Sequence, residues 1–436
     1  MRKAGHWITL FTTLTLLALL SGCSTRTLLS KKDYQPALTA FATGTPDNAL
    51  SRFPGGEEGT FITTMEKAYL DLLQGRPNID ELAKYSNIIE KRIRIQISRE
   101  MKNFLYLDLP EGYYASEHEI IWLHLLLSWG YGLRGEEEEA CVEARKSAQL
   151  LTSPWSYEDH FDDPMMRIFL TGLWSMCGSW EDARVDLRAA LQLDPTLDWT
   201  ERLSRSDSPP RHLVIILGGM GPKISWDPEL GANPMRSARN LQFLLQGKKT
   251  LLNLKGSHGK EVDLYLTPDA SNWYRRHWIR NNAIQEMIDD SKYGQVVLTS
   301  TTIAAGKALA GTTGGVITGA AIAALGAGVS YLGIEAEDGD VTILGLAIMY
   351  AGAKTGFDII KRSAQKSYSA IKRDLDSSKQ YRFVRFLPEY IWFGWSFDEL
   401  EYPLFLKSKE WGSYLGRAYP VSLGDIKVTI VHLPDV

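Results

Sequence analysis

One short pattern occurs twice in the first half of the chain, and it limits the fold more than any other feature. Gly135 precedes Ala140 by five residues, and the same step leads from Gly178 to Ala183, 43 positions further on. Between about Gly59 and Pro195, apolar residues recur at spacings of three and four, the period of a helix with one buried face. Repetition of such a segment predicts stacked pairs of helices, and the alternative is an ordinary helical bundle.

The second copy resembles the later half of a tetratricopeptide repeat. In such repeats a glycine is followed by an aromatic residue, an alanine and a closing proline, which are matched by Gly178, Ala183 and Pro195. The spacing of 43 exceeds the usual value of about 34, and a loop from Thr152 to Asp163 accounts for the excess. A degenerate unit at Lys67 to Lys91 would bring the number to three, about the minimum for a stack.

The start of the chain has the three parts of a secretory signal peptide. Arg2 and Lys3 are followed by a mostly apolar run of about 14 residues, which is too short to span a bilayer. The run ends in Leu-Ser-Gly-Cys, which resembles a bacterial lipobox. The resemblance implies that Cys23 is acylated, with palmitate among its chains, and that residues 1–22 are removed. The alternative is a plain signal peptide with a chance cysteine.

The residues after Cys23 suggest a cellular location. Ser24, rather than an aspartate, follows the cysteine, which by resemblance to enterobacterial sorting favours the outer membrane with the protein facing the periplasm. Two or three acyl chains would form a firm membrane anchor. Residues 23–58 are polar with Pro, Gly and Ser, so we expect a tether.

Charge and cysteine content narrow the partners and the redox chemistry. The net charge of −4 becomes about −6 once Arg2 and Lys3 are removed, so no nucleic acid is expected as a partner. Apart from Cys23, only Cys141 and Cys177 are present. In an oxidising periplasm these two could form a disulfide, and two buried thiols are an equally open alternative.

The second half of the chain has a different pattern. A proline-containing segment, Ser204 to Arg211, separates the helical region 59–203 from residues 212–436. His212 to Leu217, Val262 to Leu266 and Val296 to Leu298 are strand candidates, and several antiparallel strands are expected from Tyr381 onward. The expected fold class is therefore α+β, a helical repeat stack followed by a mixed domain.

An uncharged stretch runs from Ala308 to Ile334 within the Gly- and Ala-rich segment 303–356. Its glycines at 311, 315 and 319 have the spacing that lets helices pack closely. We expect a buried helical hairpin whose packing residues are Gly311, Gly315 and Gly319. Insertion into a membrane and a flexible glycine-rich loop are the alternatives.

Catalytic and ligand-binding motifs are matched only in part. Gly218 to Lys223 follows a strand, but Pro222 precedes the lysine and no hydroxyl residue follows it, so a tight turn is expected rather than a phosphate-binding loop. His118 and His124 lack the spacing of a zinc-protease helix, and Glu158 to Asp163 is expected to be a solvated acidic loop. Gly394 to Asp398 lacks the final glycine of a nucleophile elbow. We expect no enzyme activity, no cofactor and no metal site.

The order of motifs resembles one family as a whole. Met65 to Leu70 precedes Gly75, Glu119 to His124 leads into Ala140, and Leu213 to Lys223 resembles a strand ending in Gly-x-x-Pro-Lys. Arg382 to Pro388 lies where the family has a turn into Leu-Pro, although the sequence from Phe383 to Phe386 differs from the family's usual sequence. These features are similar to bacterial envelope lipoproteins of unassigned function with an N-terminal tetratricopeptide region, often encoded beside a lipoprotein activator of penicillin-binding proteins.

Together these features predict a non-enzymatic periplasmic scaffold that binds envelope proteins. Stacked repeats present a concave surface, and Trp122, Trp129 and Trp174 are candidate contacts there, although the core is the favoured place for them. The alternative function is a membrane-inserting or secretion-linked oligomer that uses residues 308–334.

Overall fold

In the computed structural model the protein is a mixed assembly of helices and sheets, so the expected α+β class is confirmed. The structure describes residues 31–43, 45–54, 61–98, 115, 117–153, 161–221, 223–226, 241–244, 252–255, 261–278, 386–400, 404–408, 412–415, 420–421 and 423–434. The helices are α2 (Lys31–Thr43), α3 (Pro46–Ser51), α4 (Phe61–Leu72), α5 (Asp80–Ser98), α6 (Glu117–Arg134), α7 (Glu137–Thr152), α8 (Pro164–Met176), α9 (Trp180–Leu193), α10 (Asp198–Ser204) and α11 (Ser271–Trp278). The strands are β1 (His212–Gly218), β2 (Lys223–Trp226), β3 (Leu241–Leu244), β4 (Asn253–Lys255), β5 (Glu261–Asp263), β6 (Tyr265–Leu266), β7 (Tyr390–Ser396), β8 (Phe405–Ser408), β9 (Gly412–Leu415) and β10 (Lys427–Leu433).

Three consecutive helical hairpins form the helical part: α4 with α5, α6 with α7, and α8 with α9. Each turns at a glycine with positive φ, namely 69° at Gly75, 79° at Gly135 and 77° at Gly178. After α8 the N–H of Ser179 donates to the carbonyl oxygen of Trp174 at 2.8 Å, a bond that ends a helix through a left-handed residue. Glycine suits these positions because it has no Cβ to clash there.

Small residues let the helices of the hairpins lie close to their neighbours. A Cβ added to Gly132 in α6 would lie 2.4 Å from the terminal methyl carbon of Met176 at the end of α8. Ala140 and Ala183, the two alanines of the repeated pattern, are both fully buried. The repeated Gly-to-Ala step therefore marks a turn and the close contact that follows it.

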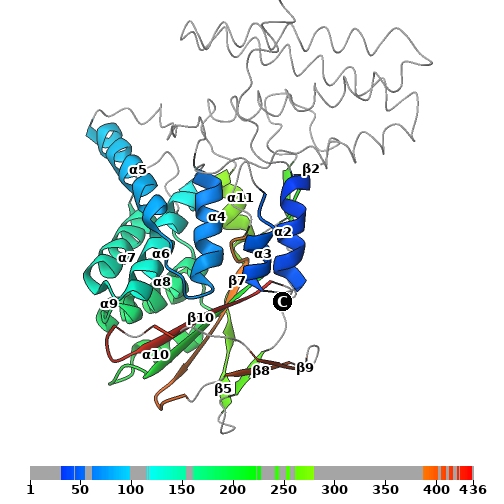
Figure 1. Ribbon diagram of the computed structural model, residues 1–436. Helices are drawn as coiled ribbons and strands as arrows, with labels where there is room; N and C mark the ends of the chain where they lie inside the picture. Colours follow the sequence, from blue (N-terminus) through cyan, green and yellow to red (C-terminus); the bar gives the residue numbers. More distant parts are fainter. Residues whose placement is uncertain are drawn as a thin grey trace, which may run out of the picture.

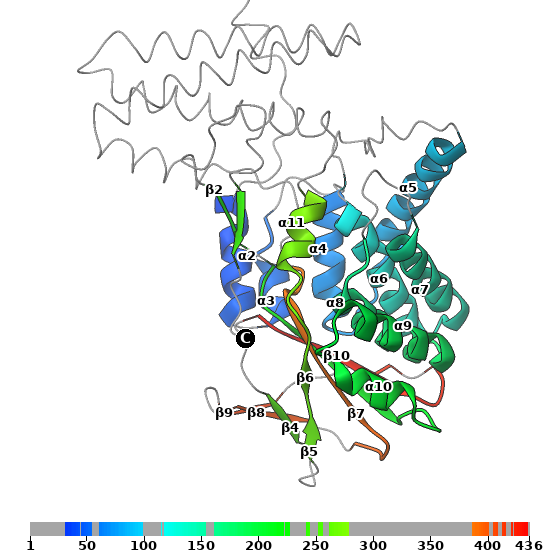
Figure 2. The same cartoon turned by 180° about the vertical axis from the view of Figure 1, so that it is seen from behind.

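A four-stranded sheet in the order β10-β1-β7-β6 lies beneath the helices (Figure 1). Several strands after Tyr381 are antiparallel to their neighbours, as expected: β7 to β1, and β8 to β9. β10 differs, since it is parallel to β1. The expected strand Val262 to Leu266 is divided between β5 and β6, which belong to different sheets. A second sheet, in the order β5-β4-β8-β9, lies on the side away from the helices (Figure 2).

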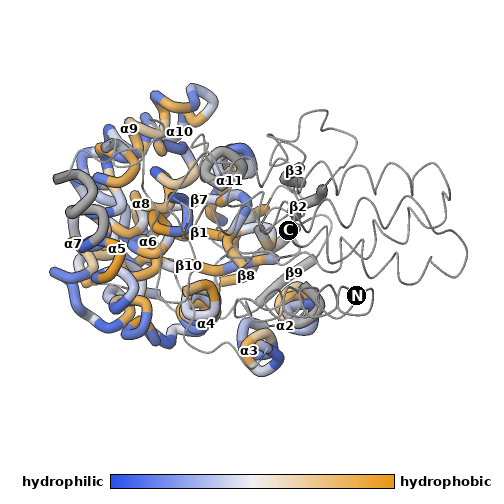
Figure 3. Tube along the Cα trace, turned by 90° about the horizontal axis from the view of Figure 1, so that it is seen from above, coloured by the Kyte–Doolittle hydropathy of each residue, from blue (hydrophilic) through white to orange (hydrophobic). Residues whose placement is uncertain are grey.

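The central strand β1 is buried on both faces, as its unbroken apolar run suggests. Leu213, Ile215 and Leu217 belong to the core shared with the helices, whereas Val214 and Ile216 pack towards the second sheet. At the closest approach, a Cβ on Gly172 in α8 would lie 2.2 Å from Cδ1 of Ile215. The described parts of 59–203 and 212–436 therefore share one core rather than forming two separately packed units. Seen from above, the apolar segments gather around β1, β7 and α8 (Figure 3).

Part of the segment expected to be a tether is folded, since residues 31–43 form α2 and residues 46–51 form α3. Tyr34, Ala37 and Phe41 in α2 are buried, and the ring of Phe41 packs edge-on against Phe386 and His432. The expectation was wrong for this part because it relied on polar composition. Apolar residues three and four positions apart give α2 one buried face in spite of that composition.

Candidate functional site

Several residues singled out in the sequence lie outside the described part of the chain. They include Cys23 with the signal segment, the strand candidate at 296–298 and the whole segment 303–356 with Gly311, Gly315 and Gly319.

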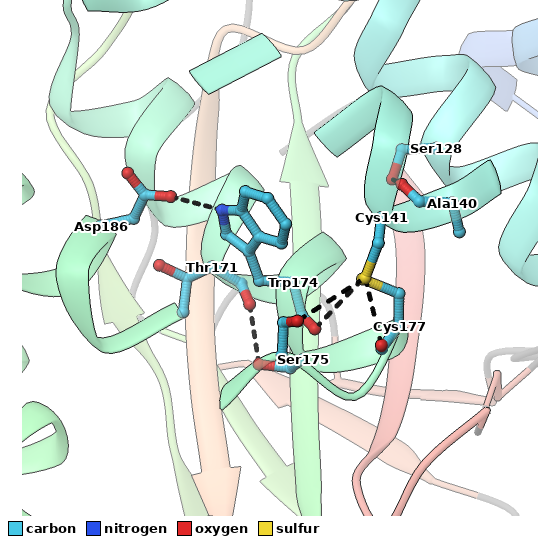
Figure 4. Close-up of a disulfide and its surroundings, with 9 residues drawn as sticks. Ser128, Ala140, Cys141, Thr171, Trp174, Ser175, Cys177 and Asp186 are labelled. Atoms are coloured by element: carbon cyan, nitrogen blue, oxygen red, sulfur yellow. Dashed lines mark hydrogen bonds between the residues drawn. A yellow bond between two sulfur atoms is a disulfide. The ribbon is translucent and has the colours of Figure 1, made fainter. Parts of the chain in front are cut away.

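Cys141 and Cys177 form a disulfide, one of the two arrangements left open by the sequence. Cys141 lies in α7 and Cys177 caps α8, and their Cα atoms are 5.6 Å apart, within the usual range for such bonds (Figure 4). The bond ties the second helical hairpin to the third.

The three candidate tryptophans belong to the core. The exposed fractions are 0% for Trp122, 2% for Trp129 and 4% for Trp174. The indole N–H of Trp122 donates to the hydroxyl of Tyr274 at 3.0 Å, and that of Trp174 donates to Asp186 at 2.8 Å. The inner faces of α6 and α8 are covered by α11 and the sheet, so these side chains cannot contact a partner directly.

A buried ion-pair network holds the third hairpin together. Arg167 in α8 is 5% exposed and donates to both carboxylate oxygens of Asp162 at 2.6 Å. It also pairs with Asp186 in α9, which is 2% exposed. Burial alone would lower the pKa of Arg167, but the hydrogen bonds and charges of the two carboxylates outweigh this and raise it.

The second hairpin has a related network one repeat earlier in the sequence. His124 and Glu143 lie 43 positions before Arg167 and Asp186, and His124 Nδ1 is 2.6 Å from Glu143 Oε2. The side chains of both are buried, with exposed fractions of 2% for His124 and 8% for Glu143. Equivalent places in the two hairpins thus hold a cationic or titratable group against a carboxylate.

The first hairpin adds a second carboxylate to the His124–Glu143 pair. Lys146 Nζ in α7 lies 2.7 Å from Glu143 Oε1 and 2.5 Å from Glu90 Oε1 in α5. Burial would raise the pKa of Glu90, but the hydrogen bond and charge of Lys146 outweigh it, and that pKa is lowered. We call Glu90, His124, Glu143 and Lys146 the hairpin cluster.

The hairpin cluster was not predicted from the sequence, where His124 was considered only together with His118. The structure places the two histidines in different surroundings, since His118 packs against the rings of Trp273 and Tyr274. Aligning the two repeats would have placed His124 opposite Arg167. The contribution of Glu90 has no such signal, because it comes from another hairpin.

The other rejected motifs have structural surroundings of their own. Gly219 lies in a turn with φ +81°, and a Cβ there would lie 2.7 Å from the carboxylate carbon of Glu389, a negative group that would repel a phosphate. In the described part of the acidic loop, Asp162 pairs with Arg167 and Asp163 caps the start of α8.

A cleft opens at the end of the sheet where strands β1 and β10 begin and strand β7 ends. Its volume is about 610 Å³, and the side chain of Phe397 beside it is 46% exposed. Lys427 Nζ is 2.5 Å from Glu399 Oε1, and this contact lowers the pKa of Glu399. The lining combines an aromatic ring with both signs of charge: Pro210, Arg211, Phe397, Glu399, Asp425 and Lys427. We call it the strand-end cleft.

Comparison with protein families, curated proteins and solved structures finds no significant match to this chain. Among the helices that the structure describes, none is both long and apolar enough to cross a membrane.

Proposed function

We propose that the protein is an acylated lipoprotein of the outer membrane, facing the periplasm, that acts as a non-enzymatic scaffold for another envelope protein. The Leu-Ser-Gly-Cys sequence ending at Cys23 supports the anchor. The disulfide between Cys141 and Cys177 supports an oxidising compartment, since such bonds persist mainly outside the cytosol.

We further propose that the three hairpins are tetratricopeptide-like repeats. Their shared glycine turns and the two buried alanines support this reading. In such stacks the inner faces of the first helices commonly hold the ligand. Here α11 packs against α6 and the chain's own sheet packs against α8, so we place the contact with a partner elsewhere.

The observation that supports the binding proposal most directly is the strand-end cleft. Phe397 offers an exposed aromatic surface beside the cleft, and aromatic residues are enriched in protein–protein interfaces. Arg211 and Lys427 lie on the same cleft as Glu399 and Asp425. An extended segment of an envelope protein, with an apolar side chain between charged neighbours, would fit this lining.

The binding proposal is tested by crosslinking in living cells. A photoreactive amino acid replaces Phe397 in the full-length chain, and a matched control replaces Val185 on α9, which is 52% exposed. We expect one discrete adduct with a single envelope protein from position 397, none from position 185, and loss of the adduct when Arg211→Glu is added. Equal labelling from both positions, or an adduct indifferent to Arg211→Glu, would refute binding at this cleft.

The address is tested separately with Cys23→Ala. We expect the variant to be soluble in the periplasm after cell fractionation and a carbonate wash, while the parent remains with the membrane. Retention of the variant in washed membranes would contradict the lipid anchor. The alternative function, insertion through residues 308–334, would then lead, and it rests on residues outside the described part of the chain.

A further inference from the structure

We propose that Glu90, His124 and Glu143 form a binding site for a divalent transition-metal ion such as Zn²⁺. Each residue offers one ligand atom, and these three atoms lie within 4.8 Å of one another. They come from three different helices, α5, α6 and α7, so the long sequence separations are closed by the fold. This inference is independent of the proposed scaffold function.

The donor set matches the chemistry of zinc. One imidazole nitrogen and two carboxylate oxygens are ligands that Zn²⁺ takes at about 2.0–2.2 Å, which places neighbouring ligands of a tetrahedral ion about 3.3 Å apart. The nitrogen of His124 and Oε2 of Glu143 are already 2.6 Å apart, so small side-chain rotations would make room for the ion. Binding would displace the proton that the two atoms now share.

Lys146 shows that this position accommodates a cation between two carboxylates. Its ammonium group contacts both Glu90 and Glu143, yet its side chain is 31% exposed. A lysine has a flexible four-carbon stem, so Lys146 can turn towards solvent and leave the carboxylates to the metal. A divalent ion would balance both negative charges, whereas the single ammonium charge balances one. Solvent on that side would supply the fourth ligand.

The third hairpin provides an internal contrast. At the place equivalent to His124 it has Arg167, whose guanidinium stays protonated and has no lone pair for a metal. The two hairpins therefore share the position of a buried ion pair, but only the second has a ligand nitrogen there. Because Glu90 belongs to the first hairpin, the ion would join hairpins one and two, as the disulfide joins hairpins two and three.

The test measures metal binding by the untagged full-length protein, purified in detergent and stripped of metal with a chelator. Zn²⁺ is titrated by calorimetry, and Co²⁺ is added separately to read tetrahedral coordination from its visible absorption. We expect one saturable site in the wild type and at least tenfold tighter binding in Lys146→Gln, in which the competing cation is gone. Adding Glu90→Gln or His124→Gln to Lys146→Gln should weaken binding at least tenfold.

Asp162→Asn is the matched control, because it alters a carboxylate that pairs with a buried cation in the third hairpin and should leave Zn²⁺ affinity unchanged. Circular dichroism checks that each variant is folded. If His124→Gln fails to fold, Glu90→Gln decides, since Glu90 lies nearer the surface with 19% of its side chain exposed. Absence of saturable binding in the wild type, or an affinity indifferent to Glu90→Gln, would overturn the metal site and leave an ion-pair cluster.

Discussion

Arg167 shows how a single residue can hold two helices together at a cost that depends on its partners. Its charge is almost fully removed from water and is compensated by Asp162 and Asp186. Removing one member of such a network is more harmful than never having had it, because a carboxylate is then left buried without a counter-charge.

We expect Arg167→Met to lower the free energy of unfolding by about 3–5 kcal/mol. Asp186 would then lie buried with only its bond to the indole of Trp174. Urea denaturation followed by circular dichroism measures the loss. Glu181→Ala, which breaks an exposed pair with Arg184, is the control and should change stability by less than about 1 kcal/mol. Similar losses in both variants would show that the buried network has no special weight.

At the scale of elements, the hairpin turn is the unit that the sequence marks most clearly. Gly75, Gly135 and Gly178 each end a first helix with positive φ, and two of them belong to the repeated pattern seen in the sequence alone. The turns were predictable because they depend on local backbone conformation. The strand at His212 to Leu217 was also predictable from a local feature, its continuous apolar run.

Gly135 allows the backbone effect of a turn to be measured without a packing effect. A Cβ at this position would meet no atom within 4 Å, while φ is +79°. We expect Gly135→Ala to reduce the free energy of unfolding by about 1–2 kcal/mol through backbone strain alone. Gly135→Asn should lose less, because asparagine tolerates the left-handed region. Thermal and urea unfolding of the two variants would contradict this explanation if Asn were as costly as Ala.

At the scale of the whole molecule, one core joins segments from both ends of the described chain. His432 in β10 accepts a hydrogen bond from Tyr69 in α4 at its Nδ1, 2.6 Å away, and donates through Nε2 to the carbonyl oxygen of Gly219. Burial lowers the pKa of His432 to about 3. Burial, helped by the charge of Lys427, also lowers the pKa of His212 to about 4.

Because of these two histidines, we expect the free energy of unfolding to decrease in mild acid. Between about pH 6.5 and pH 4, His432 and His212 become protonated in the unfolded chain but stay neutral in the folded chain. The free energy of unfolding therefore falls as the pH falls. The slope should approach about 1.4 kcal/mol per pH unit for each histidine. Urea denaturation at pH 7.5, 6.5, 5.5 and 4.5 measures it. His432→Gln should have a shallower slope over the same range, and an unchanged slope would rule out His432 as a cause.

Features that depend on neighbouring residues could be predicted from the sequence. These are the helical hairpins and their glycine turns, the strand β1, the break at Ser204 to Arg211 and the two cysteines able to pair. The hairpins, turns and strand follow from backbone preference or from the period of apolar residues, both of which act over a few positions.

Which elements contact one another became known only from the three-dimensional fold. It placed β10 parallel to β1, and it packed α11 against α6 and the sheet against α8. It brought α2 into the core in spite of a polar composition. It also brought Glu90 to His124 and Glu143 from a separate hairpin. The physical reason is that apolar periodicity shows which face of an element is buried but not what buries it. That choice follows from packing over the whole chain.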